Sequence, residues 1–445
     1  MKFFTAKVRN LPSVSLCVML QRLFLPLVFA CVACGCARFS AKPIDAERSA
    51  TSLSERRLAA KTWTLRNLVD EAMRSHPEIA LARAQYLTAK AAIRTAGESP
   101  NPTILLAPQM VTPIHWIEGT YGVDFDWTVE TAGKRPRRVD VAHEQARAAA
   151  CRVVDATWKV RSSVRKALLD LFAAQRRAGL LTDAIAKQEE LLRAMDARVR
   201  AGAMSRMEMS VPRVLSVQLR IQAADAAKAM ALARVSLAEA LGMGVSGLQG
   251  ARFSFGAFET VPGTHAAPRR MALTHRADVL AALAEYAAAE GALRLEIAKQ
   301  YPDVHLSPSY TLDGGLNKWG LGIGLTLPIL NQNKGAIGEA EAKRREAAAK
   351  FDVVQAKVIA DCDRATASAE AARVKLATAG DLLAEQARQI DSEQRLVAAG
   401  AGDSLAVFNA QVERATTSIT RLDALVELHV AVGALEDATQ TPLFR

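Results

Sequence analysis

Hydrophobic and small or polar positions alternate strictly along residues 319–329. Bulky apolar residues hold every second position, whereas small residues lie between them: Trp319, Leu321, Ile323, Leu325, Leu327 and Ile329 against Gly320, Gly322, Gly324, Thr326 and Pro328. A period of two predicts a β-strand with one apolar face. Residues 331–335 break this pattern, and a long run rich in Ala, Glu, Lys and Arg follows. We therefore expect a strand that leads directly into a long helix.

The same succession occurs 200 residues earlier, where residues 121–129 alternate and a long helical run begins near Lys134. Residues match across this constant offset: Tyr86 with Tyr286, Arg94 with Arg294, Pro102 with Pro302, Leu106 with Leu306, Gly122 with Gly322, and Lys134 with Lys334. One offset held over roughly 50 residues indicates an internal duplication rather than chance. The repeated unit reads as helix–strand–strand–helix–helix.

The elements of each copy follow from periodicity and from Gly and Pro breaks. In the first copy we expect a helix over 64–96, strands over 103–111 and 121–129 with a loop at 112–119, a helix from 134 to about 200, and a return helix to 241 kinked at Pro212. In the second copy we expect a helix over 270–300, strands over 303–311 and 319–329 joined by a loop at 314–318, a helix over 335–397, and a last helix ending near 438. The chain then divides into a leader (1–36), an extended polar tether (37–62), a first repeat (63–241), a linker (242–269) and a second repeat (270–440).

A short glycine-containing break separates the two long helices of each copy. The first contains Ala201, Gly202, Ala203 and Ser205, and the second contains Ala399, Gly400, Ala401 and Asp403. Glycine suits a left-handed helix end, while Ser and Asp suit the start of the next helix. Both breaks are predicted to be tight turns between antiparallel helices.

Composition favours long packed helices and gives no sign of catalysis. Aromatic residues make up 5% of the chain, and the net charge of +11 is spread along helices that also carry acids. No basic stripe with interleaved aromatics indicates nucleic-acid binding. The seven histidines show no metal-ligand spacing, and no nucleophile–base set is evident. We expect no enzymatic activity, no cofactor and no resident metal.

The first 36 residues have the pattern of a bacterial secretion signal. An apolar run over 23–33 follows Arg22 and is too short for a membrane span, and Met19 is an alternative start to Met1. Small residues before Cys36 resemble a lipoprotein cleavage site, with Cys34 as the second choice and an ordinary signal peptide as the alternative. The later thiols, Cys151 and Cys362, fall at different distances along their helices, so we expect buried, unlinked cysteines.

The strand over 121–129 has carboxylates on one face and aromatic residues on the other. Asp124, Asp126 and Glu130 alternate with Tyr121, Val123, Phe125, Trp127 and Val129. This is the pattern of a transmembrane β-barrel, with lipid outside and water inside, although a soluble sheet packed on one face is the alternative. We expect the three carboxylates, together with His305 beside Asp303, to face the barrel lumen, either favouring cations or simply lining the wall.

Four strands cannot close a barrel, and an open edge is not tolerated in lipid. Three chains would supply twelve strands. The helix from 134 to about 200 spans roughly 100 Å at 1.5 Å per residue. We therefore predict a mainly α fold in which a trimeric helical barrel continues into a small transmembrane β-barrel, an arrangement suited to a duct.

These features resemble the TolC-type outer-membrane efflux proteins over about residues 63–440. The resemblance rests on the duplicated units, His76-Pro-Glu78, Gly133-Lys-Arg135, the Leu327–Gly335 segment, and the paired breaks at Gly202 and Gly400. The Gly-Lys-Arg and Asn-Gln-Asn-Lys-Gly forms look most like the heavy-metal cation (CzcC-type) branch.

The resemblance implies a homotrimer in outer-membrane lipid that works with a periplasmic adaptor (membrane fusion) protein and an inner-membrane efflux pump, as the passive exit duct of a tripartite system. It also implies that the two glycine breaks are the periplasmic tips that contact the adaptor. Members often carry acids just past the second tip, where this chain has Ala406 and Asn409. Alternatives are an exit duct for drugs or a secreted polypeptide, or a periplasmic coiled-coil scaffold without a pore.

Overall fold

The computed structural model describes residues 39–109, 120–263 and 269–443. The leader with Cys34 and Cys36, and the expected loop at 112–119, lie outside these ranges. The chain divides into two units, residues 1–52 and residues 53–445. The predicted extended tether is wrong at α2 (Ala46–Ser54), which is helical because the Asp45 carboxylate accepts a hydrogen bond from the Arg48 amide at 3.0 Å and so caps its first turn. All further description concerns residues 53–445.

The first helix of the first repeat is interrupted once. α3 (Leu65–Ser75) and α4 (Pro77–Ala96) flank His76, whose backbone is extended with φ −70° and ψ 130°. The continuous helix predicted over 64–96 is therefore wrong at this position, because a residue that precedes proline is disfavoured in helical conformation. His76 also caps α4, since its Nδ1 atom accepts a hydrogen bond from the Glu78 amide at 3.2 Å.

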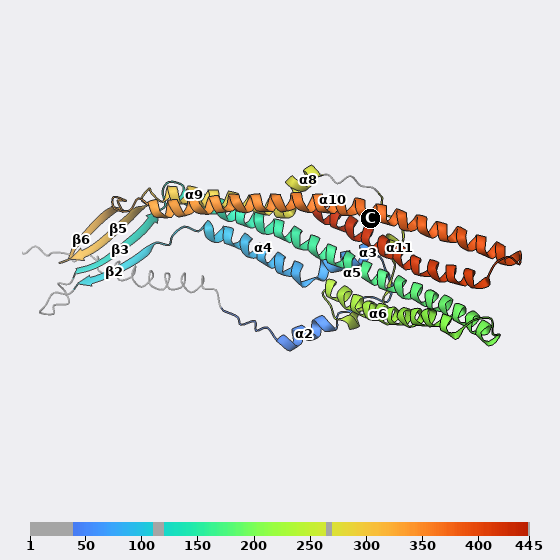
Figure 1. Cartoon of the computed structure of the whole chain (residues 1–445). Helices are drawn as coiled ribbons and strands as arrows, with labels where there is room; N and C mark the ends of the chain where they lie inside the picture. Colours follow the sequence, from blue (N-terminus) through green and yellow to red (C-terminus); the bar gives the residue numbers. More distant parts are fainter. Residues whose placement is uncertain (1–38, 110–119, 264–268, 444–445) are drawn as a thin grey trace, which may run out of the picture. The chain divides into compact units, whose positions relative to one another are not determined.

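Two very long helices form the body of this unit, and both begin where the sequence predicts. α5 (Lys134–Arg200) has 67 residues and α10 (Lys334–Ala398) has 65. Each turns back into a shorter helix, α6 (Ser210–Ala240) and α11 (Ser404–Thr439) (Figure 1). The predicted kink at Pro212 is wrong: a 3-10 turn, η1 (Arg206–Met209), precedes α6, and Pro212 lies in the first turn of α6, where its missing N–H is not needed.

The helices pack side by side along α5. Its neighbours are α4, α6, α11 and α9 (Ala277–Ala298), while α10 packs on α11 and α9. The main core contains Leu168, Leu171 and Phe172 of α5. A second core between α10 and α11 is rich in alanine, with Ala369, Ala372 and Ala424 buried. These small side chains allow the two backbones to approach closely over a long distance.

The predicted linker is folded onto this core. It contains η2 (Val245–Leu248), β4 (Arg252–Phe253) and α7 (Gly256–Glu259). The continuous helix predicted next over 270–300 is wrong at Arg276, whose backbone is extended between α8 (Arg269–His275) and α9, and the Ala277 amide donates to the Gln440 side chain at 2.8 Å. β4 pairs in parallel with β1 (Thr62–Trp63), and Phe258 is fully buried with its ring centroid 6.0 Å from that of Phe172. The linker therefore covers the middle of the α5 bundle and joins the start of the first repeat to its end.

His429 of α11 is buried beside this linker, with its ring edge-on to Phe258 at 5.5 Å. Burial lowers the pKa of the imidazole, although hydrogen bonding with the Phe258 and Thr260 backbone acts in the opposite direction. The unfolded chain therefore takes up a proton near pH 6.5, before the folded chain does. The folded state loses stability as the pH falls below 6.5, until it reaches the lowered pKa of the folded protein.

We expect the thermal unfolding temperature of the detergent-solubilised protein to fall between pH 7.5 and pH 5.5. The His429→Gln variant should show a smaller fall. The free energy of unfolding that His429 contributes to this pH dependence is at most about 1.4 kcal/mol per pH unit. The exposed His275 offers a matched control, His275→Gln. An equal pH dependence in the wild type and in His429→Gln would contradict this role for His429.

A buried ionic cluster fixes α11 against α5. The Glu436 carboxylate is fully buried between Arg161, whose Nη2 atom lies 2.6 Å away, and the Nη1 atom of Arg165. Arg165 also donates to Asp437 at 2.6 Å and to the Gly433 carbonyl at 2.9 Å. Gly433 permits this approach, because a Cβ atom there would lie 2.8 Å from Nε of Arg165. Two guanidinium groups and two carboxylates thus balance one another.

Candidate functional site

A four-stranded antiparallel sheet lies at one end of the long helices (Figure 1). It contains β2 (Thr103–Gln109), β3 (Thr120–Val129), β5 (Val304–Asp313) and β6 (Leu316–Leu325) in the order β2-β3-β5-β6. The two copies of the repeat meet where β3 pairs with β5. β2 and β6 therefore form the two edges of the sheet within one chain.

The connection between β5 and β6 is shorter than predicted. Gly314 and Gly315 have φ values of 55° and 83°, as expected for the two central residues of a tight hairpin turn. The loop expected over 314–318 is therefore wrong, since β6 already begins at Leu316. β6 also ends at Leu325, so Leu327 and Ile329 lie beyond the strand although they continue its alternation.

The register sorts side chains onto two faces, because residues directly opposite in antiparallel strands share a face. One face is apolar and includes Leu106, Val123, Phe125, Trp127, Leu306, Trp319, Leu321 and Ile323. The other face is mostly polar or small and includes Gln109, Asp124, Asp126, Thr128, His305, Ser307, Ser309, Thr311, Gly320, Gly322 and Gly324. On the apolar face Trp319 is 81% exposed and Leu321 is 68% exposed within one chain.

Three of the four residues expected in the lumen lie on the polar face. Asp126 and His305 contact each other, with 3.2 Å between a carboxylate oxygen and Nδ1, while Asp124 lies opposite Ser309. Glu130 lies beyond β3 and pairs with Arg138 of α5. The hydrogen bond to Glu130 raises the pKa of the Arg138 guanidinium. Glu130 thus links the sheet to the helix.

The junctions between sheet and helices are built differently in the two repeats. Before α5, the Lys134 ammonium pairs with Asp303 at 2.7 Å, so the partner of Asp303 is Lys134 while His305 is held by Asp126. Before α10, Asn333 has φ 60° and its side-chain amide donates to the Glu296 carbonyl at 2.8 Å. The first junction thus ties the start of a long helix to the segment between α9 and β5, and the second ties it to α9 itself.

The two glycine breaks adopt the same turn. Gly202 has φ 73° and Gly400 has φ 74°. In the first break the amides of Gly202 and Ala203 donate to the carbonyls of Val199 and Arg198 at 3.1 and 2.9 Å. In the second, Gly400 and Ala401 donate to Val397 and Leu396, both at 3.0 Å. This paired pattern is the Schellman motif, which uses the last carbonyls of a helix and reverses the chain.

Capping side chains start the return helices. The Ser205 hydroxyl accepts a hydrogen bond from the Met207 amide, and the Glu208 carboxylate accepts one from the Ser205 amide. Asp403 accepts from the Leu405 amide at 2.8 Å. Arg198 donates to the other oxygen of Asp403 at 2.9 Å, so an ion pair joins the two turns. The hydrogen bond from Arg198 lowers the pKa of Asp403.

Gly402 is a turn residue that sequence reasoning missed. A Cβ atom there would lie 2.6 Å from the Val397 nitrogen, which is backbone and has no room to yield. Gly402→Ala should weaken the second turn by about 1–2 kcal/mol, a five- to thirtyfold rise in local opening. Limited trypsin digestion should then cleave faster at Arg395. Gly338→Ala, which meets no atom within 4 Å, is the control, and equal cleavage rates in the two variants would contradict the prediction.

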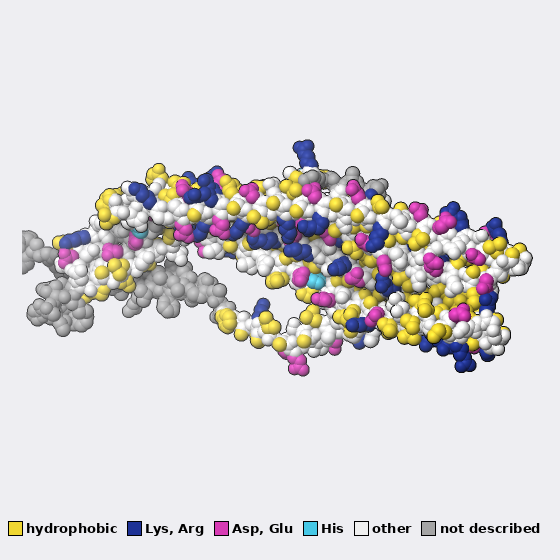
Figure 2. Space-filling model, in the orientation of Figure 1, with side chains coloured by type: hydrophobic (Ala, Val, Ile, Leu, Met, Phe, Trp, Pro, Cys, Tyr) yellow, Lys and Arg dark blue, Asp and Glu magenta, His cyan; other side chains and the backbone are white. Residues whose placement is uncertain are grey.

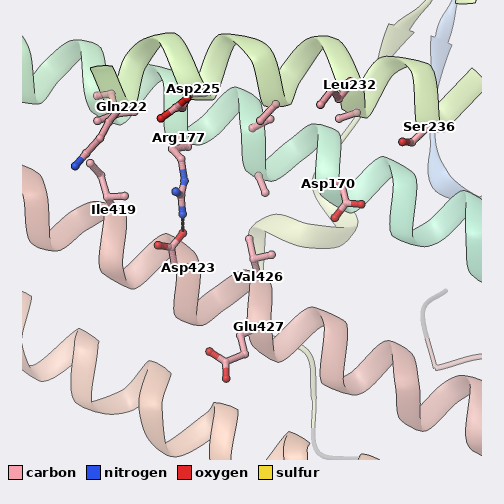
Figure 3. Close-up of a pocket in the computed structure, with 16 residues that line it drawn as sticks. Asp170, Arg177, Gln222, Asp225, Leu232, Ser236, Ile419, Asp423, Val426 and Glu427 are labelled. Atoms are coloured by element: carbon pink, nitrogen blue, oxygen red, sulfur yellow. Dashed lines mark hydrogen bonds and ion pairs between the residues drawn. The ribbon is translucent and has the colours of Figure 1, made fainter. Parts of the chain in front are cut away.

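An open cavity of about 710 Å³ lies between α5, α6 and α11 (Figure 3). Its wall is acidic, with Asp170, Asp225, Asp423 and Glu427 against one guanidinium, Arg177. Arg177 pairs with Asp423, as the dashed line shows. Burial raises the pKa of the Asp170 carboxyl, while Lys166 acts in the opposite direction. The cavity is thus a carboxylate-rich hollow in the helical wall.

The profile of the outer membrane efflux protein family matches residues 68–243 and 269–439, which together make up most of the chain and coincide with its two structural repeats. The chain belongs to the outer membrane efflux protein family. The protein is therefore located in the bacterial outer membrane and acts as an exit duct for efflux. The family is one of channels and not of enzymes.

Relatives and solved structures agree with this membership. The cobalt-zinc-cadmium resistance protein CzcC of Cupriavidus metallidurans is 24% identical over 318 residues, which cover 71% of this chain and 74% of CzcC. A membrane protein from Pseudomonas aeruginosa superposes with a TM-score of 0.71 at 20% identity, covering 84% of this chain and 92% of that chain. The outer membrane protein VceC of Vibrio cholerae superposes with a TM-score of 0.69 at 18% identity, covering 85% and 96%.

The fold of this efflux protein is therefore that of the TolC-type channels, in which a helical barrel continues into a transmembrane β-barrel. Within the described ranges no helix is both long and apolar enough to cross a bilayer. Over the same ranges no three His, Cys, Asp or Glu side chains are grouped to hold a metal ion. As expected, neither Cys151 nor Cys362 forms a disulfide within the described residues. Cys362 is buried and its thiol donates to the Ala438 carbonyl at 3.7 Å, whereas Cys151 is half-buried, less than expected.

Proposed function

We propose that three copies of this chain form the passive outer-membrane exit of a tripartite system that expels heavy-metal cations. The observation that carries the proposal is the two-faced sheet with open edges at β2 and β6. An open edge is not tolerated in lipid, so β6 of one copy would pair with β2 of the next until twelve strands close. The apolar face would then contact lipid, and Asp124, Asp126 and His305 would line the water-filled interior.

Exposed helix faces support the same association. Hydrophobic side chains lie exposed over α6 and the turn before it (Figure 2). They recur at helical spacing and are Met207 of η1 and Val211, Val214, Val217 and Ile221 of α6. α10 exposes Val353, Val374 and Leu382 in the same way. Neighbouring copies would bury these faces and complete a helical wall, as long helices without a globular cap require.

The turns at the far end of this wall are proposed to meet a periplasmic adaptor that is served by an inner-membrane pump. Ala201, Gly202, Ala203 and Ser205 of the first turn, and Ala399, Gly400, Ala401 and Asp403 of the second, present short side chains there. Small residues leave backbone and caps accessible to an elongated helical partner. The Arg198–Asp403 pair would hold the two contact points at a fixed spacing.

The heavy-metal cargo is supported by the likeness to CzcC and by the carboxylates on the polar face of the sheet. Drugs or a secreted polypeptide are the alternative cargo for the same duct. Purified protein in a planar bilayer should give single-channel conductance, and deletion of the gene should lower tolerance to zinc, cobalt or cadmium without loss of a secreted protein. Absence of conductance would contradict the duct, whereas unchanged metal tolerance would contradict the cargo.

A further inference from the structure

The contacts of His305 with Asp126 and Thr128 favour one of its two ring nitrogens as the proton carrier. Nδ1 lies 3.2 and 3.3 Å from the two oxygens of the Asp126 carboxylate and 3.4 Å from the Thr128 hydroxyl, which can accept from the same N–H. An ionised carboxylate only accepts hydrogen bonds, so this contact places a proton on Nδ1. In the neutral imidazole the lone pair is then on Nε2. The side chain of His305 is 37% exposed, so the ring is not sealed within the sheet.

This is the arrangement in which proteins present histidine to a metal ion. A ligating imidazole usually donates its second ring N–H to a carboxylate or a carbonyl, which fixes the tautomer and makes the ligating nitrogen more basic. Here the carboxylate and the imidazole come from different repeats, Asp126 from β3 and His305 from β5. The pair thus exists only because the two copies of the duplicated unit join at this seam of the sheet.

The strand on the other side of His305 carries glycine at the positions that face the polar side chains of β5. Gly324 of β6 lies directly opposite His305, and Gly322 lies opposite Ser307. A Cβ atom at Gly324 would lie 3.3 Å from Cβ of His305. β6 therefore contributes no side chain to this part of the polar face, and its backbone lies close to the Cβ of His305.

We infer that the Asp126–His305 pair is a transient binding site for late transition-metal cations such as Zn²⁺. Imidazole nitrogen suits zinc, copper and nickel, whereas Mg²⁺ and Ca²⁺ take oxygen ligands. One imidazole backed by a carboxylate binds weakly, as a duct requires, because a bound ion must leave again. The inference rests on the proposed function insofar as the polar face lines the pore, and it adds the residues that make the wall selective for this class of cation.

The test is the effect of ZnCl₂ on single-channel current through the purified protein in a planar bilayer, with MgCl₂ as the matched salt. We expect Zn²⁺ to cause brief current interruptions in the wild type that Mg²⁺ at equal concentration does not cause. His305→Ala should raise the Zn²⁺ concentration for half-maximal effect by about tenfold or more. His305→Gln is the second variant in case the alanine variant does not assemble, and it should behave in the same way.

Asp124 provides the matched control for the carboxylate. It lies on the same face of β3 two residues before Asp126 and opposite Ser309, so Asp124→Asn removes the same charge without touching the imidazole. Asp126→Asn should weaken the Zn²⁺ effect, while Asp124→Asn should leave it close to wild type. Any of three outcomes would overturn the inference. Zn²⁺ and Mg²⁺ could interrupt the current equally, the two Asn variants could respond equally to Zn²⁺, or the His305 variants could respond to Zn²⁺ as the wild type does. Those outcomes leave the channel conducting, whereas failure of the proposed duct would show as no current at all.

Discussion

Replacing Glu436 by glutamine is expected to destabilise the protein more than any other single change considered for the helical body. The carboxylate is fully buried and accepts hydrogen bonds from two guanidinium groups, those of Arg161 and Arg165. Glutamine keeps the shape but removes the negative charge, which leaves an uncompensated positive charge between α5 and α11. Breaking a buried pair in this way costs about 3–5 kcal/mol.

The neighbouring Asp437 is the natural control for this substitution. It pairs with Arg165 at 2.6 Å, but its side chain is 37% exposed, so water compensates for part of the loss. We expect Asp437→Asn to cost about 1 kcal/mol or less, as for an exposed pair. Thermal and urea unfolding of the detergent-solubilised variants should rank Glu436→Gln well below Asp437→Asn. Equal unfolding midpoints would show that the cluster does not fix α11 to α5.

Placing arginine at Leu306 is expected to prevent assembly in the membrane, whereas arginine at Ser307 is expected to be tolerated. The two residues are adjacent in β5 and lie on opposite faces of the sheet, since Leu306 is opposite Trp127 and Ser307 is opposite Gly322. If the apolar face contacts lipid, arginine at position 306 costs about 2–4 kcal/mol near the middle of the bilayer. In a trimer this unfavourable free energy would apply to each of the three copies.

Outer-membrane fractions and unheated gels measure this difference directly. Leu306→Arg should be depleted from the outer membrane and should lack the oligomer band, while Ser307→Arg should retain both. Position 307 also lies near the carboxylate of Asp126, which an arginine can approach without entering lipid. Equal depletion of both variants, or a stronger defect in Ser307→Arg, would contradict the assignment of the two faces.

The sequence predicted the parts of the fold that local chemistry determines. Alternation gave the strands, and the constant offset of 200 gave the duplication, because both signals depend on spacing alone. The starts of α5 and α10 and the turns at Gly202 and Gly400 were also predictable, since a left-handed residue or a cap marks each of them. The predicted ends of helices and strands were wrong where one or two residues determine the backbone conformation, as at His76 before Pro77 and at the Gly314–Gly315 turn.

Features that depend on distant parts of the chain were not predictable. Asp126 and His305 are 179 residues apart, and only the pairing of β3 with β5 brings them together. The same holds for Arg165 with Glu436 and for Arg198 with Asp403, which join helices of different repeats. The linker gave no sign of packing on Phe172, because its Gly, Pro and Ser content is typical of an exposed loop.

The mass of the purified protein in detergent tests the central claim most directly, because that claim assigns one third of a pore wall to each chain. Native mass spectrometry of the detergent-solubilised protein, released from its micelle, should give three copies of the mature chain and no other stable assembly. A monomer that stays soluble and folded after the detergent is removed would contradict the account.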